Sequence, residues 1–242
     1  MIESTTTKMR ALNLNGMAHT YQADYASQHI NQYSTSEYID VLINAQWDHR
    51  FNARTKRLKQ QAKFRQPASS LDLDYNAARG LEKPVMLNLL ELHFINHQQN
   101  IIITGATGTG KSFIAQCIGN KACDKHLKVL YSTLVELTTE MEMALLKGGY
   151  NKWLKKLQDC QLLILDDFGL TSITQGVKKA LIEIIDYRYG RSSTIISAQL
   201  PINKWHELIN DNTIADALLD RLIHRAHKIE LKGESMRRHK KI

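Results

Sequence analysis

One stretch of eight residues constrains the fold more than any other part of this 242-residue chain. Residues 105–112 are Gly-Ala-Thr-Gly-Thr-Gly-Lys-Ser, which matches the pattern GxxxxGK[ST] at every fixed position. A run of three isoleucines at residues 101–103 comes just before it, and a segment with Phe113, Ile114 and Ile118 on one helical face comes just after. A buried strand, a glycine loop and a helix in this order predict a phosphate-binding loop.

The residue types in this loop suit a triphosphate. Glycines let backbone N–H groups come close to a phosphate that a Cβ would keep away, and the helix N-terminus adds partial positive charge. Lys111 would place its charge on the β- and γ-phosphates, and Ser112 would offer its hydroxyl to Mg²⁺. The alternative is a glycine-rich turn that binds nothing. We expect ATP to be held by Gly105, Ala106, Thr107, Gly108, Thr109, Gly110, Lys111, Ser112 and Phe113.

Short apolar runs alternate with amphipathic segments after residue 100. The runs lie at residues 101–103, 129–131, 162–165 and 194–196, and a last strand is expected at 228–231 after a helix over 213–227. Consecutive apolar residues are typical of strands that are buried on both faces. Their alternation with helices predicts a parallel sheet built from βαβ units, as in the three-layer α/β core of a P-loop NTPase.

The chain before this core is expected to be helical. Tyr38, Val41, Leu42 and Ala45 recur at helical spacing within a segment over 34–63, and an earlier helix is expected over 20–33. Residues 66–70 (Gln-Pro-Ala-Ser-Ser) are typical of a linker, and a further helical segment lies within 74–96. The expected organisation is a small helical N-terminal region over residues 1–70 and a nucleotide-binding core over residues 71–242.

Polar side chains close the third and fourth apolar runs. Asp166 follows the third, and because Mg²⁺ prefers oxygen ligands we expect it to hold the metal together with Ser112. Asp167 would orient or deprotonate the attacking water; it is one methylene shorter than the glutamate more usual there, which favours slow basal hydrolysis. Gln199, with Ser197 as second candidate, would sense the γ-phosphate. The alternatives are an acidic strand cap and a polar residue at the start of a loop.

Basic residues exceed acidic ones, 32 to 24, which gives a net charge of +8 and favours a polyanionic partner, nucleic acid before membrane. Seven of them lie within residues 49–65, where there is no acid. Without an acid the charges repel one another unless a partner neutralises them. The alternative is a solvated helix face. We expect contacts to the phosphates of duplex DNA, independent of base sequence, from Arg50, Arg54, Lys56, Arg57 and Lys59.

Cysteine usage and hydropathy exclude several classes. Three cysteines without CxxC spacing argue against a disulfide framework or a zinc site and favour a reducing cytoplasm. No apolar run approaches the roughly 20 residues that cross a bilayer, and residues 1–10 lack the apolar core of a signal peptide, so no membrane association is expected.

Together these motifs resemble the IstB-like ATP-binding proteins, the AAA+ helpers of a transposase in one class of bacterial insertion sequence. The resemblance covers most of the chain. It rests on residues 100–105 and 110–112, on 163–169 (Leu-Ile-Leu-Asp-Asp-Phe-Gly), on 197–201 (Ser-Ala-Gln-Leu-Pro) with Trp205, and on 220–222 and 231–237. The same layout is similar to the helicase loader DnaC, a related AAA+ protein.

The resemblance implies roles for two further arginines. Arg221 would be a finger that reaches the γ-phosphate of a neighbouring subunit, and Gln199 would be sensor 1. Arg237 would be sensor 2, acting from the end of the core, because the few residues after it leave no room for a helical lid domain. The implied protein is a bacterial cytoplasmic ATPase that oligomerises with ATP at the subunit interface, binds duplex DNA and assists a transposase.

Two other functions fit parts of the sequence. A helicase loader of the DnaC type would have the same nucleotide site but would use its N-terminal region to grip a replicative helicase. A small-molecule P-loop kinase would need a lid with catalytic arginines and an acceptor pocket, and it would have no use for the basic N-terminal helix.

Overall fold

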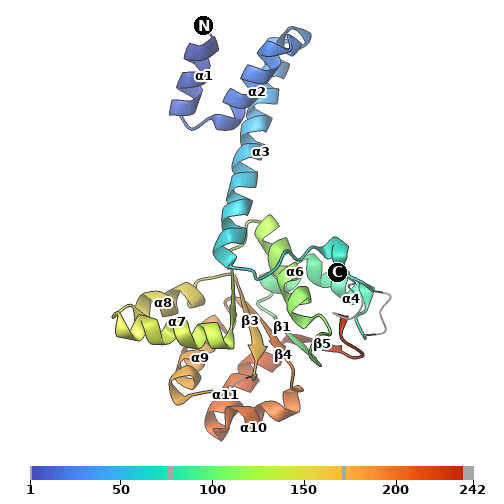
Figure 1. The fold of residues 1–242 in the computed structure, drawn as a ribbon, viewed down its shortest axis with the longest axis vertical. Helices are drawn as coiled ribbons and strands as arrows, with labels where there is room; N and C mark the ends of the chain where they lie inside the picture. The colour runs from blue at the N-terminus through green and yellow to red at the C-terminus, as the bar shows by residue number, and fades with distance from the viewer. Residues whose placement is uncertain (1, 76–78, 171–172, 237–242) are drawn as a thin grey trace. The chain divides into compact units, whose positions relative to one another are not determined.

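The computed structural model describes residues 2–75, 79–170 and 173–236 (Figure 1). The chain divides into two compact units, Met1–Arg57 and Leu58–Ile242. The division falls within helix α3 (Thr35–Ala62), earlier than the expected boundary at residue 70. The physical reason is that Leu58 and Ala62, at the end of α3, are buried in the hydrophobic core of the second unit.

The first unit is helical. It contains α1 (Ile2–Ala11), α2 (Asn15–Ala26), the 3₁₀ turn η1 (His29–Gln32) and the greater part of α3. The buried side chain of Gln46 accepts hydrogen bonds from the N–H groups of Gly16 (2.9 Å) and Met17 (3.3 Å). These N–H groups have no partner within α2, so Gln46 caps that helix. The helix expected over 20–33 therefore begins earlier, and Gln28, with a φ of 60°, separates it from η1.

The second unit is built on a five-stranded parallel sheet in the order β2-β3-β4-β1-β5. Its strands are β1 (Asn100–Gly105), β2 (Val129–Thr133), β3 (Leu162–Phe168), β4 (Ser193–Ala198) and β5 (Ala226–Leu231). The parallel sheet is as predicted. The helix expected over 213–227 is wrong at its end: α11 (Asn212–Ile223) stops earlier, because Ala226 and His227 pair with Asn100 and Ile101 of β1 as the start of β5.

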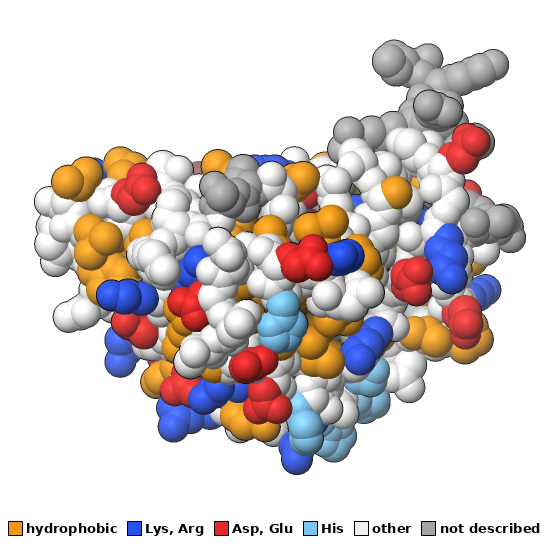
Figure 2. Space-filling model, turned by 90° about the horizontal axis from the view of Figure 1, so that it is seen from below, with side chains coloured by type: hydrophobic (Ala, Val, Ile, Leu, Met, Phe, Trp, Pro, Cys, Tyr) orange, Lys and Arg blue, Asp and Glu red, His pale blue; other side chains and the backbone are white. Residues whose placement is uncertain are grey.

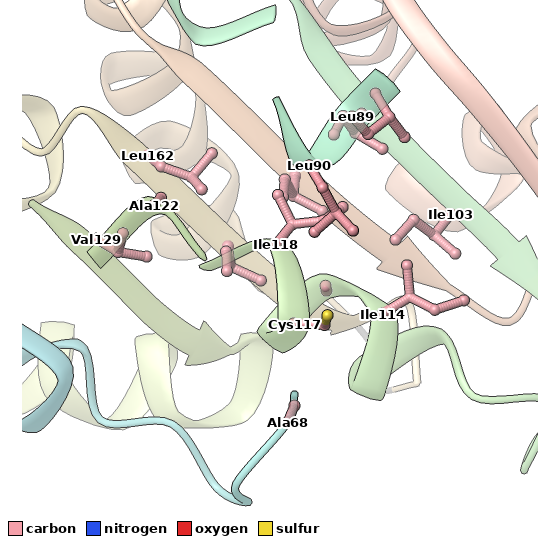
Figure 3. Packing of buried hydrophobic residues seen from close by; sticks show 14 of the residues in the cluster. Ala68, Leu89, Leu90, Ile103, Ile114, Cys117, Ile118, Ala122, Val129 and Leu162 are labelled. Carbon is pink, nitrogen blue, oxygen red and sulfur yellow. The ribbon is translucent and has the colours of Figure 1, made fainter. Parts of the chain in front are cut away.

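Helices cover both faces of the sheet, which gives the expected three layers. Ile101 and Ile103 belong to the core on one face and Ile102 to the core on the other, since successive side chains of a strand point to opposite sides. The first face is covered by α4 (Lys83–Leu90), α5 (His93–Asn96) and α6 (Lys111–Asp124), and Figure 3 shows Ile114 and Ile118 of α6 among its core residues. The second face is covered by α7 (Leu134–Leu146), α8 (Tyr150–Gln158), α9 (Gln175–Arg188), α10 (Trp205–Ile209) and α11.

Two further observations concern the surface. Figure 2 shows a face of the molecule on which Lys and Arg side chains are interspersed with Asp and Glu, so this face offers a polyanion no continuous basic patch. Within the described ranges, no helix combines the length and the apolar character that a bilayer crossing requires.

Candidate nucleotide site at the carboxyl ends of the strands

The glycine loop joins the end of β1 to the start of α6, as the motif predicts. Lys111 is only 6% exposed, and its Nζ donates hydrogen bonds of 2.8 Å to the carbonyl oxygens of Gly105 and Ala106. The hydroxyl of Thr109 donates to the same Ala106 carbonyl at 2.9 Å. These bonds direct carbonyl groups of the loop toward the protein's own donors.

Two of the loop glycines are required by their surroundings. Gly108 and Gly110 have φ values of 85° and 97°, in the region that side-chain-bearing residues rarely adopt. A Cβ on Gly108 would overlap the side chain of Ser235, and a Cβ on Gly110 would lie 2.5 Å from Nη1 of Arg79. The loop is therefore enclosed from outside by two segments that are distant in sequence.

Asp166 lies fully buried at the end of β3, where hydroxyl groups from three elements converge on it. Oδ1 accepts from the hydroxyls of Ser112 (3.0 Å) and Ser197, and Oδ2 accepts from Tyr131 at 2.6 Å. Burial, followed by the hydrogen bond to Asp166, raises the pKa of Tyr131 well above its usual range, so the phenol stays a donor. The structure thus brings together the two expected metal ligands, Ser112 and Asp166.

Asp167 differs from Asp166 in backbone and environment. Its φ is 54°, a left-handed conformation that Asp and Asn adopt more readily than most residues. Its N–H donates to Oδ1 of Asp166 at 3.0 Å. Asp167 and Gln199, from β3 and from the end of β4, line the same cleft as the glycine loop. The expected catalytic acid and sensor therefore share a cleft with the loop.

The cleft at this edge of the sheet has a volume of about 420 Å³, within the range of small-molecule sites. Its walls come from the loop, from the ends of β3 and β4, and from residues before β1 and after β5. They are Gln66, Asp72, Asp74, Arg79, Thr107, Gly108, Gly110, Lys111, Ser112, Phe113, Asp167, Gln199 and Met236.

Arg79 is a site residue that sequence reasoning missed. It is 5% exposed, and its guanidinium donates to the carbonyls of Thr109 (3.0 Å) and Asp74 (2.9 Å), while its Nε is buried without a partner among the described residues. Burial lowers the pKa of Arg79, and the nearby carboxylate of Asp74 opposes that shift. No motif marks this arginine in the sequence, since it precedes the first strand in a segment without hydrophobic periodicity.

The segment after β5, in which the sequence predicts Arg237 as the site residue, is hydrogen-bonded to Arg79 and to the glycine loop. The N–H of Lys232 donates to the carbonyl of Arg79 (2.8 Å), and the N–H of Met236 donates to the carbonyl of Gly108 (2.9 Å). Arg237, the expected sensor 2, lies outside the described residues.

Arg221 lies at the opposite end of the strands from its own chain's loop. Its carbonyl accepts from the side chain of Asn100, the first residue of β1, at 3.2 Å. Its guanidinium forms an ion pair of 2.7 Å with Asp186. The arginine therefore does not reach the cleft of its own chain, and a role in hydrolysis would require the cleft of another copy.

The basic segment divides into two parts. Arg65, Lys63 and Lys59 form ion pairs with Glu136 (2.9 Å), Glu140 (2.8 Å) and Asp124 (2.7 Å), which lie far away in the sequence. The inference that only an external partner could neutralise this run is therefore wrong for its last three charges. The preceding basic residues are exposed and have no ion pair among the residues that the structure describes: Arg50, Arg54, Lys56 and Arg57.

These features fit a nucleoside triphosphate and Mg²⁺. Gly108 and Gly110, at positive φ, shape a loop without side chains at these two positions, and such a loop lets a phosphate approach the backbone closely. The hydroxyl of Ser112 and the carboxylates of Asp166 and Asp167 are hard oxygen ligands, the kind that Mg²⁺ prefers.

The chain is similar to known proteins over nearly its whole length. A family model described as IstB-like ATP binding protein matches residues 7–242. An insertion sequence ATP-binding protein of Sinorhizobium fredii is 38% identical over 237 residues, which cover 98% of this chain and 97% of that protein.

Two solved structures have a similar fold. One is the crystal structure of DnaI (TM-score 0.60, 19% identity, 73% of this chain and 94% of that chain). The other is the DnaC helicase loader (TM-score 0.55, 17% identity, 73% and 99%). These similarities show that the α/β fold is shared. The chain belongs to the IstB-like ATP-binding protein family of insertion sequences.

Proposed function

We propose that this protein is an ATPase that binds duplex DNA without sequence preference, oligomerises with ATP and assists a transposase in insertion-sequence transposition. The observation that carries the hydrolytic part is the hydrogen bond of 3.0 Å between Ser112 and Asp166, at the same cleft as Lys111, Asp167 and Gln199. A phosphate loop next to two acids at a strand end is an arrangement that positions a triphosphate and a water.

Different residues of the cleft would bind the phosphates, hold the metal and activate the water. Lys111 and the N–H groups of the loop would bind the phosphates, and Ser112 and Asp166 would hold Mg²⁺, which supplies positive charge against the developing charge on the phosphate oxygens. Asp167 would accept a proton from the attacking water, and Gln199 would orient that water against the terminal phosphate. Hydrolysis by one copy alone is expected to be slow and to be stimulated by DNA or by a partner protein.

The exposed arginines of α3 support the proposal that the protein binds DNA. Arg50, Arg54 and Arg57 are exposed on α3, and their spacing places them on one side of the helix. Contacts to phosphates would give affinity that falls steeply with salt and does not depend on base sequence. Lys59, which is paired with Asp124, is expected to contribute less than Arg50, Arg54, Lys56 and Arg57.

Two different observations support the oligomer and the transposase partner. Arg221 lies away from its own cleft, so it would act as a finger on the cleft of a neighbouring copy, where its charge stabilises the transition state. The similar protein of Sinorhizobium fredii is named for an insertion sequence, which supports a transposase as partner and a bacterial cytoplasm as location. ATP at the junction between copies would favour assembly, and hydrolysis would release it.

The finger has a direct test by complementation. Lys111→Ala removes the phosphate-binding cation and Arg221→Ala removes the finger, so each variant alone should hydrolyse ATP poorly. Mixed together, an intact cleft in one copy meets an intact finger in the next, and hydrolysis should recover. Absence of recovery, in a mixture that still co-assembles on duplex DNA by electron microscopy, would rule out action in trans.

A helicase loader remains the second candidate, because the fold is similar to those of DnaI and DnaC. Duplex-DNA gel shifts and pull-down with a replicative helicase separate the two functions. Retention of the helicase, without an ATP-dependent shift of duplex DNA, would favour the loader.

A further inference from the structure

Residues 63–68, here called the connecting segment, form hydrogen bonds with α6, the helix that begins at the phosphate loop. The N–H groups of Arg65 and Gln66 both donate to Oε1 of Gln116, at 2.8 and 3.2 Å. Gln116 is 1% exposed, and its Nε2 donates to the carbonyl of Ser112 at 3.1 Å. One buried amide therefore joins the connecting segment to the first turn of α6, which carries the expected metal ligand.

The connecting segment also contacts α6 beyond Gln66. Asn120 of α6 donates to the carbonyl of Ala68 at 3.1 Å, and Ala68 is buried in the same core cluster as Cys117. Figure 3 shows Ala68 on the strip of chain next to α6, close to Cys117. Gln66 also lines the nucleotide cleft. The connecting segment is thus part of the surroundings of the nucleotide and is not a free linker.

The side chain of Arg65 reaches a second part of the site. Its Nη2 donates to Oε1 of Glu136 at 2.9 Å and to the hydroxyl of Thr133 at 3.3 Å. Thr133 ends β2 and pairs in register with Asp166 of β3. The hydrogen bond with Glu136 raises the pKa of Arg65, and the charge of Asp167 adds to this effect. Arg65 therefore interacts with the edge of the sheet that carries both acids.

The same segment continues directly from α3. Helix α3 extends over Thr35–Ala62, so the exposed arginines 50, 54 and 57 lie on the same helix that leads into the connecting segment. A displacement of the end of α3 must change the path of residues 63–66, which are tied to α6 and to the end of β2.

We propose that Arg65 is a positioning residue through which duplex DNA on α3 and nucleotide in the cleft act on each other. This inference rests on the proposed function and names its regulation. Nucleotide and metal at Ser112 would fix the first turn of α6 and, through Gln116, the backbone of Arg65. DNA held by α3 would in turn change the contact of Arg65 with Thr133 and Glu136, beside Asp166. Such coupling between two binding sites is reciprocal.

Binding linkage tests the inference without relying on hydrolysis. Fluorescence anisotropy gives the affinity for a labelled duplex with and without a non-hydrolysable ATP analogue, and hydrolysis is measured with and without the duplex. In the unmodified protein the analogue should change the duplex affinity, and the duplex should change the hydrolysis rate, each by at least about fivefold. These two fold-changes are the ratios compared below. In Arg65→Ala both ratios should fall below about twofold, while the duplex and the analogue still bind when each is added alone.

Three variants separate coupling from loss of charge or of stability. Lys63→Ala removes a charge from the same segment and breaks the ion pair with Glu140, but it does not remove a donor to Thr133. Its DNA affinity should change little, because Glu140 already neutralises Lys63, and the ratios should persist. Arg191→Ala removes an exposed arginine that lies over the ring of Tyr187, and it should behave as the unmodified protein. Arg65→Lys keeps the charge but not the fork of donors, and it should restore the ratios only in part.

The outcomes are distinguishable. Ratios in Arg65→Ala equal to those of Lys63→Ala overturn the inference and leave the proposed function intact. A lower melting temperature with unchanged ratios would assign Arg65 a purely structural role and also overturns it. The proposed function itself is overturned if the unmodified protein binds no duplex. It is also overturned if the duplex affinity is the same with and without the ATP analogue.

Discussion

Tyr131 donates a hydrogen bond of 2.6 Å to Oδ2 of Asp166, from the strand next to the one that carries the acid. Both side chains are buried, and the other oxygen of Asp166 is shared by the hydroxyls of Ser112 and Ser197. The carboxylate expected to hold Mg²⁺ is thus oriented by a residue outside every recognised motif. Hydrogen bonds of this kind fix the geometry of metal ligands and tune their affinity.

Removal of that donor should weaken metal binding. Tyr131→Phe keeps the ring in the core but leaves Oδ2 without this partner, and the apparent Mg²⁺ affinity should fall by about tenfold. Titration of Mg²⁺ in nucleotide-binding and hydrolysis assays measures the change. Tyr150→Phe is the matched control, because the hydroxyl of Tyr150 is bonded to exposed Glu183 on another surface. Equal Mg²⁺ dependence in both variants would contradict the role of Tyr131.

Arg79 should support nucleotide binding through the loop backbone. Its guanidinium orients the Thr109 carbonyl, and the N–H at the other end of that peptide group belongs to Gly110. Charge-assisted hydrogen bonds contribute about 1.5–3 kcal/mol each, so Arg79→Ala should lower the affinity for ATP and ADP by about tenfold or more. Arg79→Lys should recover little, because a lysine lacks the planar fork in which Nη1 and Nη2 each donate to one carbonyl. Calorimetric titration measures affinity, and melting without nucleotide reports stability separately; full affinity in Arg79→Ala would exclude this role.

Asp167 should be required for hydrolysis and dispensable for binding. Asp167→Asn preserves the shape and tolerates the φ of 54°, so nucleotide affinity and melting temperature should stay near those of the unmodified protein. Loss of the proton acceptor should slow hydrolysis by about 100-fold or more. Asp167→Glu offers a longer carboxylate, but its side chain is less suited to this backbone, and the melting temperature should fall. Persistent hydrolysis in Asp167→Asn would transfer the role to another group.

The two parts of the basic segment should differ in their effect on DNA binding. Arg54→Ala should reduce the slope of log affinity against log salt by about one, since it removes one exposed phosphate contact. Lys59→Ala should change the slope less, because Asp124 at 2.7 Å already neutralises Lys59. Anisotropy at several salt concentrations measures both slopes. A larger effect from Lys59 than from Arg54 would mean that the ion pair opens when DNA binds.

Stability should fall in alkaline solution. Burial raises the pKa of Cys117 and of Cys123 to about 12, whereas an exposed thiol ionises near pH 8.5, roughly. Between these values the unfolded chain has lost protons that the folded chain retains, so the free energy of unfolding decreases as pH rises, by up to about 1.4 kcal/mol per pH unit for each thiol. Denaturant titrations from pH 8 upward measure the slope. The Cys117→Ala/Cys123→Ala variant should show a shallower slope; an unchanged slope would assign the effect to other groups.

Much of the fold could be predicted because its signals are local. The isoleucines at 101–103 and the glycine loop are contiguous, and each buried strand shows its character within a few residues. The end of α11 was misjudged for a related reason. Residues 224–227 have no strong pattern of their own, and only the edge of β1, which supplies backbone partners, makes Ala226 and His227 a strand.

The sequence by itself determined the phosphate loop, the parallel sheet and the pair of acids, because each depends on residue types at fixed short spacing. Tertiary structure decided what surrounds them: Tyr131 on Asp166, Arg79 on the loop, and Arg65 between Gln116 and Glu136. It also decided that Lys59 is neutralised within the chain, by Asp124, whereas Arg54 is not. These pairings join residues tens of positions apart, and strand order and helix packing, which no local pattern encodes, bring them within hydrogen-bonding distance.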